Sequence, residues 1–286
     1  MIWITVIIVA ALGLGLYAVI IEPQLRLRVT KYDLPLFKDK DLARPLKIVV
    51  LSDIHACKPW MSAAHIARIV KRANALSPDI IMLLGDYETG IHKPFCLGFL
   101  KPEEWAPPLG ALKAPHGIYA VLGNHDWSED LEGSRRALLK EHITVLENQS
   151  SRVSVGGNNH LWVAGLADQY SDDGKLHGPG RRDDLRATLE QVEQDGRPII
   201  LLAHEPDIFP QVPDGVSLVL SGHTHGGQVL LPFIGAIKVP SLHGKRFVYG
   251  RHDEGSKTLI VSAGLGCSQL PIRFRCAPEI VEINLT

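Results

Sequence analysis

Two histidines in the segment 222–228, which reads GHTHGGQ, are the residues of this chain best suited to chemistry. They follow the apolar run 216–220, which has the length and β-branched content of a buried strand. In an extended segment residues i and i+2 point to the same side, so His223 and His225 are predicted to reach into one cleft. Glycines beside them allow backbone to approach a bound group closely. On this pair alone, metal binding and partly exposed polar residues at a strand end are equally good interpretations.

Four further apolar runs end in polar residues of the same chemical types. The runs 46–51, 79–84, 117–122 and 198–202 each have the composition of a buried strand. The polar residues that follow these runs are Asp53, His55, Asp86, Asn124, His125 and His204. In α/β sheets, functional side chains gather where strands end at their carboxyl side. We therefore expect all of them to share one site with the two histidines above.

Each of these residues alone has a structural explanation. An aspartate after a strand is often a helix N-cap, an asparagine after a glycine suits a turn, and a histidine can be a satisfied core residue. Five such strand ends in one chain favour a shared site instead. Carboxylate, imidazole and carboxamide groups suit Mn²⁺, Fe, Zn²⁺ or Mg²⁺. Eight such groups are too many for one tetrahedral ion, so two divalent ions are predicted.

The elements that must position these residues are those of an α/β fold. Continuous apolar strands predict a sheet that is covered by helices, and helical spacing of apolar residues marks 66–76, 131–141 and 185–192. The stretch 168–180 is rich in Asp, Gly and Ser and is predicted to be a surface loop.

The first residues of the chain predict a membrane anchor. Residues 2–21 carry no charge, and twenty apolar residues are enough to cross a bilayer as a helix. The alternatives are a buried helix of a soluble protein, which rarely lacks a polar face over this length, and a cleaved signal peptide. Neither a basic leader nor a small-x-small cleavage site is visible, which favours an uncleaved anchor. The predicted layout is an anchor over 1–24, a juxtamembrane connector over 25–45 and a catalytic domain over 46–286.

Charge restricts the partners and the orientation. The formal net charge is −1 and the pI is about 6.9, which argues against a nucleic-acid partner. The four cysteines form no CxxC pair. Basic residues follow the apolar run and none precedes it, so the positive-inside tendency predicts a cytoplasmic catalytic domain. These basic residues are Arg26, Arg28, Lys31, Lys38, Lys40, Arg44 and Lys47.

The order Asp-x-His, Gly-Asp, Gly-Asn-His-Asp, lone His and Gly-His-x-His, from Asp53 to His225, resembles the signature of the calcineurin-like metallophosphoesterase superfamily. This resemblance implies a four-layer α/β/β/α sandwich with a dinuclear metal centre, most often Mn²⁺ for this ligand type. It implies that Asp86 bridges the two ions. By position, one ion is held by Asp53, His55 and His225, and the other by Asn124, His204 and His223.

The same resemblance makes His125 the catalytic histidine, which interacts with the scissile phosphate or the leaving group. Asp126 is expected to orient or tune His125, and a role as a helix cap is an equally good interpretation. Arg273 is a candidate phosphate contact because a guanidinium suits bidentate oxyanion recognition; its alternative is a surface salt bridge.

A narrower resemblance, to the membrane-anchored YkuE/YaeI-type branch, rests on the anchor and on short motifs near both ends of the chain. That branch is similar to LpxG-type UDP-2,3-diacylglucosamine pyrophosphatases of lipid A biosynthesis, which implies a lipid substrate at a bacterial inner membrane. The alternatives are a phosphodiesterase or phosphatase of broad specificity and a non-catalytic anchored scaffold. The motifs are Glu22-Pro23, Leu27-Arg28-Val29-Thr30, Gly264-Leu265-Gly266, Leu270-Pro271-Ile272-Arg273 and Pro278-Glu279.

Overall fold

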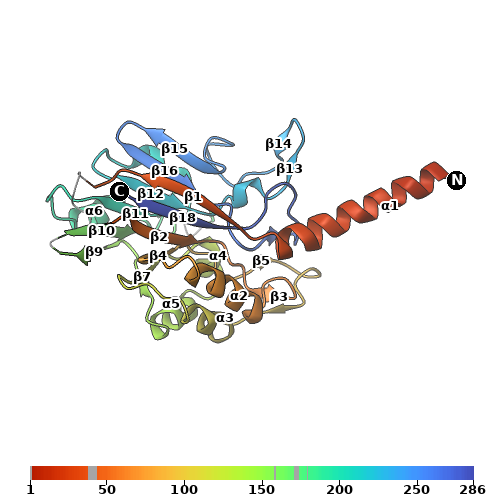
Figure 1. Ribbon diagram of the computed structural model, residues 1–286, viewed down its shortest axis with the longest axis horizontal. Helices are drawn as coiled ribbons and strands as arrows, with labels where there is room; N and C mark the ends of the chain where they lie inside the picture. The colour runs from red at the N-terminus through yellow and green to blue at the C-terminus, as the bar shows by residue number, and fades with distance from the viewer. Residues whose placement is uncertain (1, 38–43, 158, 171–173, 179) are drawn as a thin grey trace.

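Two six-stranded sheets pack face to face, and one long helix projects from the body that they form (Figure 1). The computed structural model describes residues 2–37, 44–157, 159–170, 174–178 and 180–286. Within these residues the helices on the outer faces and the two sheets form the layers α/β/β/α. The predicted sandwich is therefore confirmed.

The first sheet contains three of the predicted site strands as parallel neighbours. Its outer face is covered by α2 (Ala63–Asn74), α3 (Pro102–Leu109) and α5 (Leu131–Lys140). The pairs β2–β4, β4–β7, β7–β8 and β1–β18 are parallel, and β18–β2 is antiparallel. In order, the strands are β1 (Arg28–Leu34), β18 (Glu279–Leu285), β2 (Leu46–Leu51), β4 (Ile80–Leu83), β7 (Ile118–Ala120) and β8 (Thr144–Val145).

The second sheet contains the other two site strands, also as parallel neighbours. Its outer face carries α6 (Leu185–Glu190) and the 3₁₀ helix η2 (Pro206–Gln211). In order, the strands are β15 (Gly250–Glu254), β16 (Lys257–Val261), β12 (Leu218–Ser221), β11 (Ile199–Leu202), β10 (Asn159–Gly165) and β9 (Gln149–Gly156).

Short elements surround the ends of these strands. Three two-stranded pairs lie outside the main sheets. They are β3 (Cys57–Lys58) with β6 (Gly98–Phe99), β5 (Gly90–Ile91) with β17 (Ser268–Gln269), and β13 (Leu230–Leu231) with β14 (Gly235–Ala236). The helix α4 (Asn124–Glu129) and the 3₁₀ turn η3 (His225–Gly227) begin directly at site residues.

The central strands β2, β4, β11 and β12 are apolar along nearly their whole length because both of their faces are buried. In β2, Ile48 and Val50 face the other sheet, whereas Val49 and Leu51 face the helices. In β12, Leu218 and Leu220 face the first sheet, and Val219 faces η2. Side chains alternate between the two faces of a strand, so a strand buried on both sides carries an unbroken apolar run.

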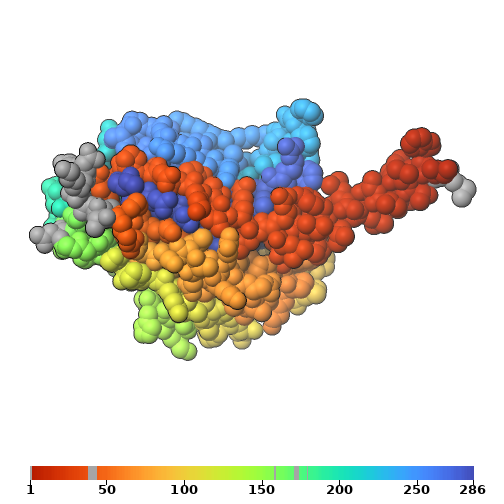
Figure 2. Space-filling model, viewed as in Figure 1, coloured from red at the N-terminus to blue at the C-terminus, as the bar shows by residue number. Residues whose placement is uncertain are grey.

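The N-terminal apolar segment is a helix that stands clear of the body (Figure 2). The helix α1 (Ile2–Leu16) continues into the π-helical turns of η1 (Tyr17–Leu25), and the whole is long and apolar enough to cross a membrane. Its most apolar window has a mean hydropathy of 2.7 and is not buried against the protein. This exposure argues against a core helix and supports membrane anchoring.

The end of η1 is attached to the body by specific contacts. Ala18 and Glu22 are buried. The Ala18 carbonyl accepts a hydrogen bond from the Arg273 N–H (2.9 Å), and Glu22 Oε2 accepts one from the Arg275 N–H (2.8 Å). The anchor therefore meets the body through bonded contacts as well as through the chain itself.

The segment 25–45 differs from the expected connector. Residues 28–34 form β1, which pairs in parallel with the whole of β18 at the edge of the first sheet. An edge strand has one unpaired side and tolerates polar residues. Such a strand carries no continuous apolar run, so it was not predicted from the sequence. The part of the predicted connector over 38–43 lies outside the described residues.

Glu279 ties β1 to the rest of the fold. Its carboxylate is buried and accepts hydrogen bonds from Arg28 Nε (3.1 Å), Tyr249 Oη (3.0 Å) and the Ala263 N–H (2.8 Å). We expect Arg28→Met to lower the free energy of unfolding by about 2 kcal/mol, because it leaves the buried Glu279 carboxylate without its cationic partner. The expected loss is moderate because Arg28 itself is partly exposed to solvent.

Thermal unfolding of the full chain in detergent, followed by circular dichroism, measures this loss as a fall in Tm of roughly 4–8 °C. The control is Arg186→Met, which removes an exposed pair with Glu190 and is expected to cost about 0.3–0.5 kcal/mol. Equal shifts for the two variants would contradict a structural role for β1.

Candidate metal centre

The predicted site residues meet at one end of the sandwich because their strands run parallel. Asp53 and His55 follow β2, Asp86 follows β4, and Asn124 begins α4 after β7. In the other sheet His204 follows β11, and His223 follows β12. The carboxyl ends of neighbouring parallel strands lie at one edge of a sheet, and here both sheets present that edge to the same place.

The backbone at these strand ends is strained. Asp53, His55, Asp86, His223 and His225 all have φ between 49° and 65°, in the left-handed region. A non-glycine residue there costs about 1–3 kcal/mol and persists only where the surroundings hold it. The extended conformation predicted for His223 and His225 is therefore wrong, because the chain turns into η3 at this point. Both rings nevertheless enter the site.

Asp53, His55 and His225 form one compact group. One ligand atom from each lies within 4.8 Å of the other two, and all three residues are buried. His55 Nε2 is 3.0 Å from His225 Nε2, and Asp53 Oδ1 is 3.7 Å from His225 Nε2. Three donors converging at these distances have the spacing of ligands around a single ion.

Asp86, His204 and His223 form a second group with the same spacing. Asp86 Oδ2 lies 3.2 Å from His204 Nε2 and 3.4 Å from His55 Nε2, so one carboxylate oxygen contacts a histidine of each group. This is the position a bridging carboxylate requires. Its other oxygen, Oδ1, accepts a hydrogen bond from the His125 N–H (2.9 Å).

Asn124 supplies an independent indication of a missing partner. Its Oδ1 atom is buried and has no hydrogen-bond partner among the residues that the structure describes. A buried amide oxygen without a partner costs about 1–3 kcal/mol, and a cation would satisfy it. Together with the six carboxylate and imidazole groups, this oxygen completes a donor set that suits divalent ions without any thiolate. The donors of the chain therefore fit a dinuclear site, and the role of each ligand stays a prediction.

Burial keeps most of these imidazoles neutral, which is the form that binds metal. It lowers the pKa of His55 to about 4 and that of His223 to about 3. For His204, burial lowers the pKa, but the neighbouring negative charge of Asp86 raises it by more. The pKa of His204 therefore lies well above the ordinary value. His204 Nδ1 lies 2.6 Å from the Leu84 carbonyl, a contact that directs Nε2 toward Asp86.

His125 and Asp126 are adjacent in sequence but have different surroundings. His125 is partly exposed at the site, and its ring lies edge-on to His55 with centroids 5.1 Å apart. Asp126 is fully buried, and its carboxylate accepts hydrogen bonds from the backbone N–H groups of Gly123, Asp86, Tyr87 and Glu88 at 2.8–2.9 Å.

The Asp126 carboxylate accepts its hydrogen bonds from backbone donors and not from the His125 ring, so its expected role in orienting or tuning His125 stays a prediction. Its alternative as a cap is the better interpretation, because it caps α4 and also joins the loops after β4 and β7.

Arg273 is also placed differently from the prediction. Its side chain is 0% exposed and donates to the carbonyls of Gly266, Ala263 and Cys276, and its Nη2 lies 3.3 Å from His225 Nδ1. A buried guanidinium with these partners cannot contact a phosphate in the cavity, and it forms no surface salt bridge. It packs instead behind a predicted metal ligand and fixes the chain around it.

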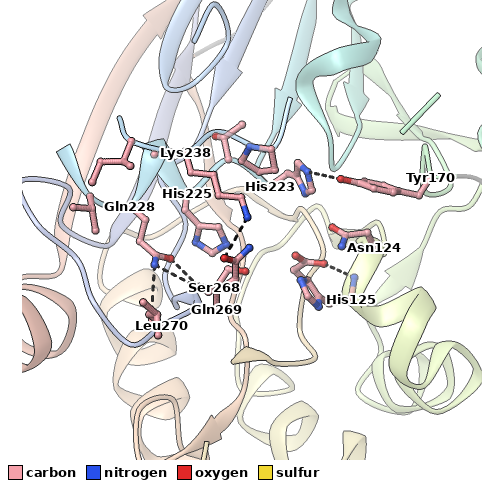
Figure 3. Close-up of a pocket in the computed structure, with 16 residues that line it drawn as sticks. Asn124, His125, Tyr170, His223, His225, Gln228, Lys238, Ser268, Gln269 and Leu270 are labelled. Carbon is pink, nitrogen blue, oxygen red and sulfur yellow. Dashed lines mark hydrogen bonds between the residues drawn. The ribbon is translucent and has the colours of Figure 1, made fainter. Parts of the chain in front are cut away.

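A cavity of about 350 Å³ opens beside the two groups (Figure 3). Asp86, Asn124, His125, His223 and His225 line it on the side of the two groups. The rest of its lining mixes the apolar residues Val229, Ile237, Pro240 and Leu270 with polar ones.

Sequence reasoning missed several polar residues of this cavity. Tyr170 places its hydroxyl 3.4 Å from His223 Nε2, and Lys238 Nζ lies 3.3 Å from Gln269 Oε1. Tyr170 comes from the stretch predicted to be a surface loop, whose residues 171–173 and 179 lie outside the described residues. The Lys238 segment carries no motif, so only the fold brings it to the site.

Comparison with known proteins agrees with this geometry. Residues 46–227 match the family described as calcineurin-like phosphoesterase. The chain is 34% identical over 241 residues to the uncharacterized metallophosphoesterase YkuE of Bacillus subtilis, covering 84% of this chain and 78% of that protein.

Two animal relatives are longer. The chain is 34% identical to the putative metallophosphoesterase F40B5.2 of Caenorhabditis elegans, over 95% of its own length and 54% of that protein. It is 32% identical to a transmembrane protein with metallophosphoesterase domain of Danio rerio, over 90% of its own length and 57% of that protein. The chain thus spans a little over half the length of these two relatives.

Metal content tests the predicted ligand roles. The wild-type chain, loaded with Mn²⁺ and desalted, is expected to hold about two ions, and Asp86→Asn about one or fewer, since the bridge loses a charged oxygen. His125→Ala is the matched control and should keep both ions, because His125 is expected to act on substrate. Elemental analysis by mass spectrometry gives the ratios. Equal content in wild type and Asp86→Asn would contradict the bridging role.

Proposed function

This chain belongs to the calcineurin-like phosphoesterase family and is a hydrolase, and we propose that it cleaves a phosphoester or phosphoanhydride bond of a membrane lipid. The observation that carries the proposal is the composition of the cavity. Metal-ligand candidates and His125 line the cavity together with the apolar side chains of Val229, Ile237, Pro240 and Leu270. Such a cavity suits a substrate with a phosphate at one end and a hydrocarbon portion at the other.

The position of the anchor supports the same proposal. The residues that line the cavity at 268–270 precede Arg273 and Arg275, whose N–H groups bond to the end of the anchor helix. The cavity wall and the anchor are thus neighbours along one short segment. Tethering an enzyme beside its substrate raises the effective concentration of that substrate.

The side chains of the cavity have distinct roles in this proposal. Bound divalent cations supply the positive charge that activates a water molecule and stabilises the attacking and leaving oxygens of an in-line displacement. His125 donates a proton to the leaving oxygen. Lys238, which also lines the cavity, neutralises phosphate charge. The Tyr170 hydroxyl, beside His223, donates a hydrogen bond to a phosphate oxygen.

The specific substrate proposed is UDP-2,3-diacylglucosamine, and the metal is Mn²⁺. The support for this substrate is the sequence resemblance together with the combined polar and apolar cavity. The proposed location is the bacterial inner membrane, with the bilayer as the partner of α1.

Hydrolysis by the purified chain in detergent tests the substrate. With Mn²⁺ we expect wild type to release UMP from UDP-2,3-diacylglucosamine and to lose this activity in a chelator. Asp86→Asn and His125→Ala should both reduce turnover by about a hundredfold or more. Chromatography of the nucleotide product measures the release.

The control substrate is a soluble phosphodiester such as bis-p-nitrophenyl phosphate. If only that ester is cleaved, the enzyme is a phosphodiesterase without lipid preference, and the lipid proposal fails. If neither substrate is cleaved in any divalent metal, the dinuclear assignment fails as well.

The catalytic domain is proposed to face the cytoplasm, because a cluster of basic residues follows α1 closely. Leu139 is exposed on α5, away from the site, and the four native cysteines are buried. An impermeant maleimide should therefore label Leu139→Cys only after the cells are broken. Labelling of intact spheroplasts would place the domain on the other side.

A further inference from the structure

A second apolar surface lies beside the anchor. The hairpin β13–β14 ends in Phe233, which is fully exposed, and Ile234, which is 63% exposed. Ile237, just after the hairpin, is 62% exposed. We call residues 230–237 the apolar hairpin. In Figure 1 it stands at the end of the body from which α1 projects, and it points to the top of the view while α1 extends to the right. Exposed large apolar side chains that gather in one place commonly mark a surface of interaction.

The apolar hairpin and the anchor share one support. The Leu230 N–H donates to the Phe274 carbonyl (2.9 Å), and the Phe274 N–H donates to the Gln228 carbonyl (3.0 Å). The Phe274 ring packs edge-on against Tyr17 of the anchor, with centroids 6.1 Å apart. One residue thus contacts the base of the hairpin and the end of the anchor helix. Both apolar elements therefore contact Phe274, and Figure 2 shows them at the same end of the body.

Cationic side chains accompany this surface. Lys245 Nζ donates to the Ile234 carbonyl at 2.8 Å, and Lys238 follows the hairpin directly. Both residues are exposed. Exposed apolar side chains with a neighbouring ammonium group, here that of Lys245, suit the interface of an anionic bilayer, where hydrocarbon lies below the lipid phosphates.

We infer that the apolar hairpin inserts into the bilayer that α1 crosses, as a second and separate membrane contact. The occupant is lipid because the hairpin shares the support of Phe274 with a helix that is long and apolar enough to span a membrane. Insertion of Phe233 and Ile234 brings the cavity, which Ile237 and Lys238 line, to the membrane surface. The inference rests on the anchoring by α1 and not on the identity of the substrate.

Site-directed labelling of the full chain tests this insertion. The native Cys57, Cys96, Cys267 and Cys276 are buried, so a new exposed cysteine is labelled selectively. The variants Phe233→Cys and Ile234→Cys are each labelled with an NBD fluorophore. Each is then reconstituted into vesicles of phosphatidylcholine and phosphatidylglycerol. Leu139→Cys, at an equally apolar exposed position on α5, is the matched control. Only those cysteine variants whose Tm equals that of the wild type enter the comparison, so that unfolding does not explain a difference in fluorescence.

We expect doxyl-labelled lipid to reduce NBD emission at 233 and 234 by about twofold or more, and to leave the label at 139 unchanged. Iodide present on both sides of the vesicle should quench only the label at 139. The inference is overturned if iodide quenches the label at 233 as strongly as that at 139. It is equally overturned if neither quencher reaches 233, because protein would then cover the hairpin. These readouts need no turnover, so their failure is separate from failure of the proposed reaction.

Discussion

The Asp126 carboxylate is the contact on which the site depends most. Four backbone N–H groups from the loops after β4 and β7 converge on its two oxygens. These loops carry Asp86, whose backbone is left-handed, and Asn124, whose amide oxygen has no partner among the described residues. Neither feature is favourable alone. Buried hydrogen bonds to a carboxylate are among the stronger ones in proteins, and here they offset that cost.

Most of the fold and of the site could be predicted because both depend on local pattern. Unbroken apolar runs indicated strands buried on both faces, and polar residues at their ends indicated a shared edge. The α5 helix, expected over 131–141, is observed over Leu131–Lys140. Strand β1 was missed because an edge strand carries polar residues. Arg273 was misassigned because residue type alone does not reveal whether a charged group faces a cavity or backbone carbonyls.

The C-terminal segment unites features that the sequence keeps far apart. Arg273 packs behind His225, Phe274 contacts the anchor and the hairpin, and Glu279 closes the edge of the first sheet. These residues lie outside the strand-end motifs, so no motif indicates that they approach the site. Tyr170 and Lys238 were not predicted for the same reason. Their positions follow from long-range packing, which only the folded chain defines.

The bonded junction between η1 and residues 273–275 has a mechanical consequence. A flexible linker lets a domain sample many heights and tilts above a bilayer. Here the end of the helix is held by backbone hydrogen bonds and by the buried Glu22 carboxylate, so few such arrangements remain. With α1 in a membrane, the distance from the hydrocarbon boundary to the reactive centre becomes a fixed length of the molecule. If the substrate is a membrane lipid, as proposed, this fixed length selects headgroups whose phosphate lies at that height.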